Sequence, residues 1–159
     1  MTDTVPLSDE VLALMRNAAQ KAIESGAPFL SPRAILLAML DDPFIGPTLG
    51  AAVNREKVRG AQDSGTDALR AADDIFPDGE AVPIARYDTL AFKTPDGRAN
   101  VWLNREALQI FVEGAHRAQD RYVPKDLALG VAAQAVHAPS VLSAIGVEPG
   151  VLTEAIYKL

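Results

Sequence analysis

The stretch that decides the fold is Leu7-Ser8-Asp9-Glu10-Val11-Leu12, which returns 96 positions later as Leu103-Asn104-Arg105-Glu106-Ala107-Leu108. In both stretches a leucine precedes a Ser or Asn, and a second leucine follows four positions after that polar residue. A Ser or Asn in this place can accept a hydrogen bond from the first turn of a helix, and the two leucines can pack around it as a hydrophobic staple. Cap and staple together predict two helices that start in the same way and belong to two copies of one unit.

The first copy contains the signals of four helices. Apolar residues three and four apart predict a helix over residues 9–25, and Gly26 is placed to end it because glycine takes the left-handed conformation without steric cost. Ser31 as cap and Pro32 as first helical residue predict a second helix, which Asp41-Asp42-Pro43 ends. A short helix over residues 47–53 and another from Arg55 complete repeat 1, at about residues 7–59.

The second copy, repeat 2, covers about residues 103–159. We therefore expect an all-α fold in which two four-helix repeats pack about a pseudo-twofold axis in one domain of residues 1–159. After a small deletion Phe29-Leu30 aligns with Tyr122-Val123, and further along Val58 aligns with Val151. We expect Phe29, Leu30, Tyr122 and Val123 to form the core between the repeats.

The connection between the repeats, about residues 60–100, has another character. Its residues 66–75 could prolong the fourth helix. Further on, Thr94-Pro95-Asp96-Gly97-Arg98 lies between two short alternating runs and predicts a β-hairpin. A lone hairpin is marginal in water, so we expect Phe92 and Trp102 to hold it against the helices. The same two aromatic residues are candidates for contact with a partner protein.

The composition narrows the function classes. The chain has 15 Lys and Arg against 21 Asp and Glu, a net charge of -6 that argues against nucleic-acid binding. The absence of cysteine excludes disulfides, thiolate nucleophiles and cysteine-based metal sites. The longest apolar run, residues 34–40, is too short to cross a bilayer, and residues 1–10 do not have the basic start of a signal peptide. We expect a cytoplasmic protein with no nucleic-acid or membrane partner.

Catalytic and metal-binding patterns are weak. His116 and His137 do not form a His-x-x-x-His pair, so we expect surface or helix-end roles for them and no metal or cofactor. Asp41 and Asp42 are adjacent, and side chains one residue apart on a helix do not face each other as an acid–base pair would. We therefore expect helix-end roles for these carboxylates as well.

Two tandem units of this kind, each with a capped and stapled first helix, an aromatic–aliphatic pair and a leucine-rich second helix, resemble the N-terminal domain of Clp ATPases. The resemblance covers about residues 7–59 and 103–159. It implies an eight-helix domain that binds protein substrates, adaptor proteins or exposed peptide segments and hands them to an unfoldase. The domain also occurs in stand-alone proteins, and this chain has no Gly-x-x-x-x-Gly-Lys-Ser/Thr loop for nucleotide phosphates.

The start of the second helix in each repeat departs from the family pattern. In ClpC-type members this helix opens with Gly-Thr-Glu-His, whose glutamate takes part in recognising phosphorylated arginine. The matching stretches here are Ser31-Pro32-Arg33-Ala34 and Pro124-Lys125-Asp126, in which a cation replaces the glutamate. Recognition of phosphorylated arginine in that manner is therefore not expected. Arg33 and Lys125, with Asp126 beside the latter, are candidates for contact with an acidic partner; the alternative is that the two cations are exposed first-turn residues with no partner.

The leading hypothesis is a non-catalytic protein-binding module that acts as a stand-alone adaptor, substrate recruiter or decoy for a Clp-type chaperone–protease system. Its partners would be a Clp ATPase, its adaptors or its substrates. A second hypothesis keeps the fold but assigns it to sequestering a small molecule. A third, a small hydrolase that uses Asp or His, lacks any nucleophile motif in the sequence.

Overall fold

The computed structural model describes residues 4–62, 81–83 and 90–159. Within them, two sets of four helices follow one another: α1 (Asp9–Glu24), α2 (Pro32–Asp41), α3 (Gly46–Gly50) and α4 (Arg55–Gly60), then α5 (Arg105–Arg117), α6 (Pro124–His137), α7 (Pro139–Ala144) and α8 (Pro149–Tyr157). Four short strands accompany them: β1 (Thr4–Pro6), β2 (Ala81–Pro83), β3 (Ala91–Lys93) and β4 (Asn100–Trp102). The expected extension of the fourth helix over residues 66–75 lies outside the described residues.

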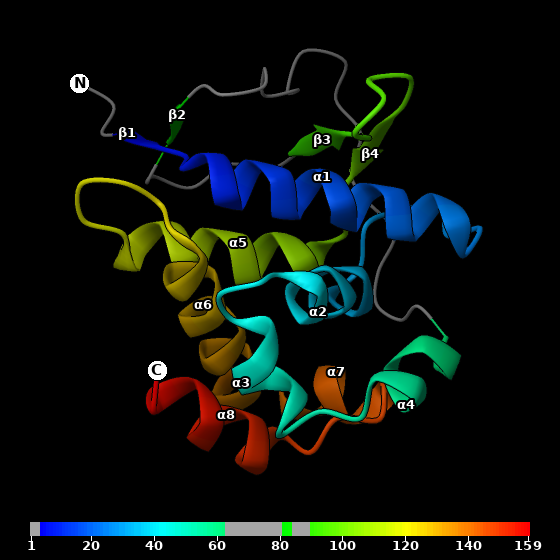
Figure 1. Ribbon diagram of the computed structural model, residues 1–159, viewed down its shortest axis with the longest axis vertical. Coiled ribbons are helices and arrows are strands. Elements are labelled where there is room, and N and C mark those ends of the chain that lie inside the picture. Colours follow the sequence, from blue (N-terminus) through cyan, green and yellow to red (C-terminus); the bar gives the residue numbers. More distant parts are fainter. Residues whose placement is uncertain (1–3, 63–80, 84–89) are drawn as a thin grey trace.

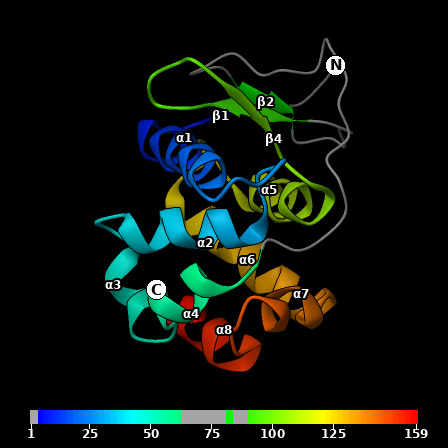
Figure 2. The same cartoon turned by 90° about the vertical axis from the view of Figure 1, so that its right-hand side faces the viewer.

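The elements lie in tiers, as Figures 1 and 2 show. The strands occupy one end of the molecule, and α1 and α5 lie beneath them. The helices α2 and α6 form the middle, and α3, α4, α7 and α8 form the opposite end. The predicted all-α architecture of two four-helix repeats is confirmed, and the hairpin lies in the connection between them.

The capped helix starts are the same in both repeats, as predicted. The Ser8 hydroxyl accepts a hydrogen bond from the Val11 N–H at 3.2 Å, and the Asn104 amide oxygen accepts one from the Ala107 N–H at 3.0 Å. Both capping side chains are buried, so without them the backbone N–H would have no hydrogen-bond acceptor and no water to replace it. At the other end of α1, Gly26 takes a φ of 74°, the left-handed conformation that the sequence predicted.

The two repeats exchange backbone hydrogen bonds where they meet. Tyr122 donates its N–H to the Pro6 carbonyl at 2.8 Å and accepts the Ser8 N–H at 2.9 Å, so it bridges Leu7. In the same manner Leu30 donates to the Trp102 carbonyl at 2.8 Å and accepts the Asn104 N–H at 3.0 Å. The segment before the first helix of each repeat thus pairs with the segment before the second helix of the other, as a pseudo-twofold axis requires.

This exchange corrects the alignment of the repeats by one position. It makes Leu30 the equivalent of Tyr122, and both are fully buried, whereas Val123 is 37% exposed. Phe29 is buried as well. The expectation of a buried Val123 is therefore wrong, because this residue occupies the N-cap position of α6, where the chain turns outward.

The last helices need a correction of one position in the opposite direction. Val58 is the fourth residue of α4, and the fourth residue of α8 is Leu152; both side chains are fully buried. Val151, which the sequence alignment paired with Val58, is 49% exposed. That pairing is wrong, because repeat 2 has one residue more than the alignment allowed between the starts of its third and fourth helices: α7 has 6 residues where α3 has 5.

The predicted hairpin is confirmed and is anchored in the core. Strands β3 and β4 pair antiparallel, with Phe92 opposite Val101. The Phe92 ring lies edge-on to Phe111 with centroids 5.4 Å apart, and Phe111 stacks on Tyr122 at 4.8 Å. The Tyr122 hydroxyl donates to the Phe111 carbonyl at 2.8 Å. The hairpin is therefore fixed to repeat 2 through aromatic contacts.

A second sheet was not predicted. Strands β1 and β2 pair antiparallel, with Val5 opposite Val82. Each strand has three residues, and Pro6 and Pro83 lie at their ends. Such short segments show no alternating pattern that a sequence could reveal.

Helices α5 and α6 approach closely because both carry glycine where they meet. A Cβ on Gly130 would overlap the Ile110 carbonyl oxygen and lie 3.0 Å from the Gly114 nitrogen, and one on Gly114 would overlap the Tyr122 hydroxyl. Counted from the helix starts, the equivalent residues of α1 and α2 are Ala18 and Ala38. Repeat 1 therefore has a methyl group at each place where repeat 2 has none.

Candidate peptide-binding groove

A groove of about 280 Å³ opens between α1 and the end of α2. Four lining residues are apolar, Ala13, Leu14, Ala38 and Pro43, and are called the floor here; Leu14 and Ala38 are buried, and Ala13 and Pro43 are exposed. The other four lining residues are polar, Glu10, Asn17, Asp41 and Asp42, and are called the rim here. The volume suits one or two side chains of a bound segment, since it lies at or below the lower bound of typical small-molecule sites.

The end of α2 shapes one wall of the groove. Asp42 caps the helix, and its carboxylate accepts hydrogen bonds from the Phe44 and Ile45 N–H groups, each at 2.9 Å. These bonds hold the chain in a turn after Pro43, with Ile45 buried and Phe44 65% exposed. The helix-end role expected for Asp42 explains why a large aromatic side chain is left at the surface beside the groove.

Asp41 joins three elements at the rim. Its carboxylate contacts the Lys21 ammonium at 2.9 Å and the Arg55 guanidinium at 2.5 Å, and Arg55 also donates to the Leu40 carbonyl at 3.1 Å. Burial raises the pKa of Asp41, but the hydrogen bonds and charges of Lys21 and Arg55 outweigh it, so the net pKa lies below the usual 3.8. These contacts fix the positions of α1, α2 and α4 around the groove.

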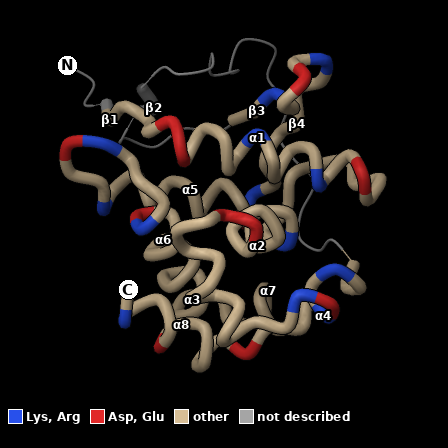
Figure 3. The backbone as a smooth tube through the Cα atoms, viewed as in Figure 1, with Lys and Arg blue, Asp and Glu red and all other residues tan. Residues whose placement is uncertain are grey.

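Glu10 is the carboxylate of the rim that remains open to a ligand. It lies in the first turn of α1 and is exposed, and no ion pair involves it within residues 4–62, 81–83 and 90–159. Figure 3 shows acidic residues at the start of α1 and at the end of α2, with basic residues further along α1 and on α4. The groove therefore has a negative rim with its counter-charges outside the lining.

Arg33 is not an exposed residue. It is 6% exposed, its Nε donates to the Val58 carbonyl at 2.8 Å, and its NH2 group donates to the Arg59 carbonyl. The guanidinium thus binds the last turn of α4, where a cation also stabilises the helix dipole. Both sequence-based alternatives, an acidic-ligand contact and an exposed residue without a partner, are corrected by this burial.

The other candidates from the second helices are separated from one another. Lys125 is exposed in the first turn of α6. Asp126 is 9% exposed, and its carboxylate accepts the Val123 N–H at 3.0 Å, which is a helix-capping role. Lys125 alone of the three first-turn residues is open to a partner, so the structure does not assemble them into one site.

The aromatic candidates of the hairpin have different surroundings. Phe92 is 2% exposed and packs on Phe111, so its proposed contact with a partner is corrected to a core role. Trp102 is half-buried in β4.

The sequence did not predict the groove residues as a site, because Asp41-Asp42-Pro43 gives the same helix-ending signal whether or not a groove lies beside it.

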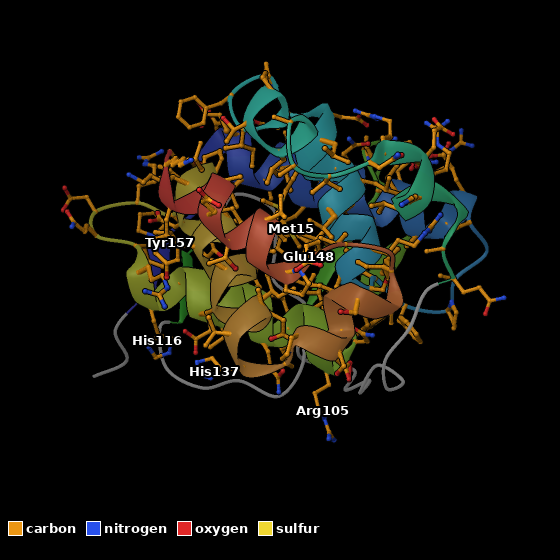
Figure 4. The ribbon with its side chains drawn as sticks, turned by 90° about the horizontal axis from the view of Figure 1, so that it is seen from below. Met15, Arg105, His116, His137, Glu148 and Tyr157 are labelled. Carbon is orange, nitrogen blue, oxygen red and sulfur yellow. The ribbon has the colours of Figure 1, made fainter. Side chains whose placement is uncertain are left out.

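No group of three or more His, Cys, Asp or Glu that could hold a metal ion occurs in the part of the chain that the structure describes. His116 and His137 lie on the outer surface of α5 and at the end of α6, in contrast to Met15, which is fully buried (Figure 4). None of the helices in the described segments is both long and apolar enough to span a membrane.

Comparison with known proteins identifies the fold. Neither protein-family models nor curated protein sequences give a match. Among solved structures, the N-terminal domain of the caseinolytic protease associated chaperone ClpD from Arabidopsis thaliana is similar, with a TM-score of 0.57 and 14% identity. The likeness covers 96% of this chain and 95% of that one. The fold of this chain is that of a Clp N-terminal domain.

Proposed function

We propose that this protein is a non-catalytic protein-binding module that serves as an adaptor, substrate recruiter or decoy for a Clp-type chaperone–protease system. The observation that carries the proposal is the likeness to a Clp chaperone N-terminal domain over 96% of the chain, with both four-helix repeats present. Fold alone does not define function, so the site must support it.

The groove supplies that support. Its apolar floor, polar rim and exposed neighbour Phe44 are the features of a surface that binds a short peptide segment through a few side chains. The catalytic alternatives lack such support. Asp41 is held by Lys21 and Arg55, and Asp42 by two backbone N–H groups. Neither carboxylate is poised to move a proton.

The test is a degradation assay with a purified Clp ATPase, its peptidase and a fluorescent unfolded substrate. An adaptor or recruiter raises the initial rate in proportion to the amount of this protein, whereas a decoy lowers it. A variant with the groove filled, Ala13→Trp, should lose most of either effect, because Ala13 lies on the groove floor and is exposed. An unchanged rate, together with no capture of the ATPase or the substrate, would refute the proposed function.

A further inference from the structure

We propose that the groove between α1 and α2 binds a peptide segment in which a lysine or arginine stands next to an apolar residue. The inference rests on the proposed protein-binding function and names the chemistry of the bound segment. It is argued from the charge of the rim, the nature of the floor and the contrast with repeat 2.

The rim selects a cation. Three carboxylates, those of Glu10, Asp41 and Asp42, line the groove, and the lining contains no Lys or Arg. Lys21 and Arg55 reach Asp41 from outside the lining and compensate its charge, whereas Glu10 has no ion-pair partner among the residues that the structure describes. The net charge of -6 adds a long-range attraction for a basic segment.

The floor selects an apolar stem and an apolar neighbour. A Lys or Arg side chain buries its methylene groups along apolar surface and keeps its charge at the polar edge, which is the arrangement of this groove. Phe44 follows Pro43 of the floor directly and is 65% exposed. Its ring offers a further apolar contact, or a face for a guanidinium.

Repeat 2 does not build the same site. In register with the helix starts, the equivalents of Asp41, Asp42 and Pro43 are Ala133, Gln134 and Ala135, all buried within α6, which continues to His137. Gln109 stands where the groove has Ala13, and Gly130 brings α6 against α5. The cation site therefore belongs to repeat 1 alone among the two equivalent helix pairs.

The test uses fluorescence anisotropy with a labelled ten-residue peptide that contains two Arg-Leu pairs in a Gly-Ser background. A counterpart with glutamate in place of arginine is the ligand control. We expect the Arg-Leu peptide to bind at least about tenfold more tightly than the Glu-Leu peptide, and to weaken as salt is added. Equal binding of the two peptides would overturn the charge assignment.

Matched variants locate the site. Glu10→Lys should weaken binding of the Arg-Leu peptide by about tenfold, whereas Asp9→Lys, the same change one position outside the lining, should leave it within about twofold. Ala13→Trp should abolish binding, and Gln109→Trp in repeat 2 should not. Circular dichroism and melting temperature confirm that each variant is folded.

The outcomes separate this inference from the proposed function. If the Arg-Leu peptide binds but ignores both Glu10→Lys and Ala13→Trp, the groove assignment fails and protein binding stands. If no peptide binds while the degradation assay responds to the protein, the cationic segment is wrong and the function again stands. Failure of both assays refutes the function and the inference together.

Discussion

The helix pair α1–α2 and the helix pair α5–α6 start alike and end differently. Both first helices have a buried side-chain cap, and both second helices begin with proline. The pair α5–α6 then closes over Gly114 and Gly130, whereas α1–α2 carries alanines and stops at Asp41. Capping residues decide where a helix begins, but the small residues along it decide how near its neighbour comes. The difference leaves a groove in repeat 1.

The largest effect is expected from Gly130→Ala. The added methyl group would overlap the Ile110 carbonyl oxygen, so α6 must move away from α5, at a cost of about 3 kcal/mol in unfolding free energy. Gly50→Ala is the matched control, because a Cβ at that helical position meets nothing within 4 Å. Urea unfolding of both variants measures the contrast. Similar stability of Gly130→Ala and wild type would show that the helices do not depend on glycine.

Next come the two equivalent first-turn cations. Arg33→Met should lower the unfolding free energy by about 2 kcal/mol, since it removes hydrogen bonds from a charged group to the end of α4. Lys125→Met should stay within about 0.5 kcal/mol, because Lys125 is exposed. Thermal unfolding of both variants measures the two losses of stability. Equal losses would contradict the structural role that burial gives to Arg33.

The two caps should behave alike. Ser8→Ala and Asn104→Ala remove the same hydrogen bond at the same place in each repeat, and each should cost about 1 kcal/mol. Ser140→Ala at an exposed position of α7 is a control that should be neutral. Chemical denaturation gives the values. A loss of stability in only one of the two variants would mean that the two caps do not stabilise their helices equally.

The smallest effect concerns pH. Asp41 has a folded-state pKa below the usual 3.8, so its ion pairs stabilise the protein above that value, and the contribution disappears as pH falls through the lowered pKa. Asp41→Asn should therefore lower stability by less than about 1 kcal/mol at pH 7, because the pair is partly exposed. The gap to wild type should vanish well below pH 3.8. If the difference in stability between Asp41→Asn and wild type persists at low pH, the effect comes from packing and not from the ion pairs.

Local signals in the sequence predicted much of the fold. Ser8, Asn104 and Gly26 act through neighbours within a few positions, so their roles could be read directly. The register between repeats could not, because Leu30 and Tyr122 are identified as equivalents only through bonds to the other repeat. The alignment misjudged by one residue how much shorter repeat 2 is between its first and second helices, because such a difference in length has no periodic signature.

The candidate site was less accessible to sequence reasoning. Arg33 follows a proline in a first turn, which is typical of an exposed residue, but its partners at Val58 and Arg59 lie on another helix. The groove depends on where α2 ends relative to α1. No local sequence pattern predicts the distance between the end of α2 and α1. Sequence supplied the carboxylates at Asp41 and Asp42, and the fold decided which of them face a ligand.

Because of the hydrogen bonds that Leu30 and Tyr122 make to the other repeat, each half of the chain lacks some of its backbone hydrogen-bond partners when it is alone. A fragment without residues beyond Trp102 lacks both the Tyr122 carbonyl that accepts the Ser8 N–H and the Asn104 N–H that Leu30 accepts. Two fragments produced by a break in the connection would therefore be complementary, each supplying the groups that the other lacks. Such a protein is suited to division into a split reporter, in which recovery of the folded state signals that the pieces have met.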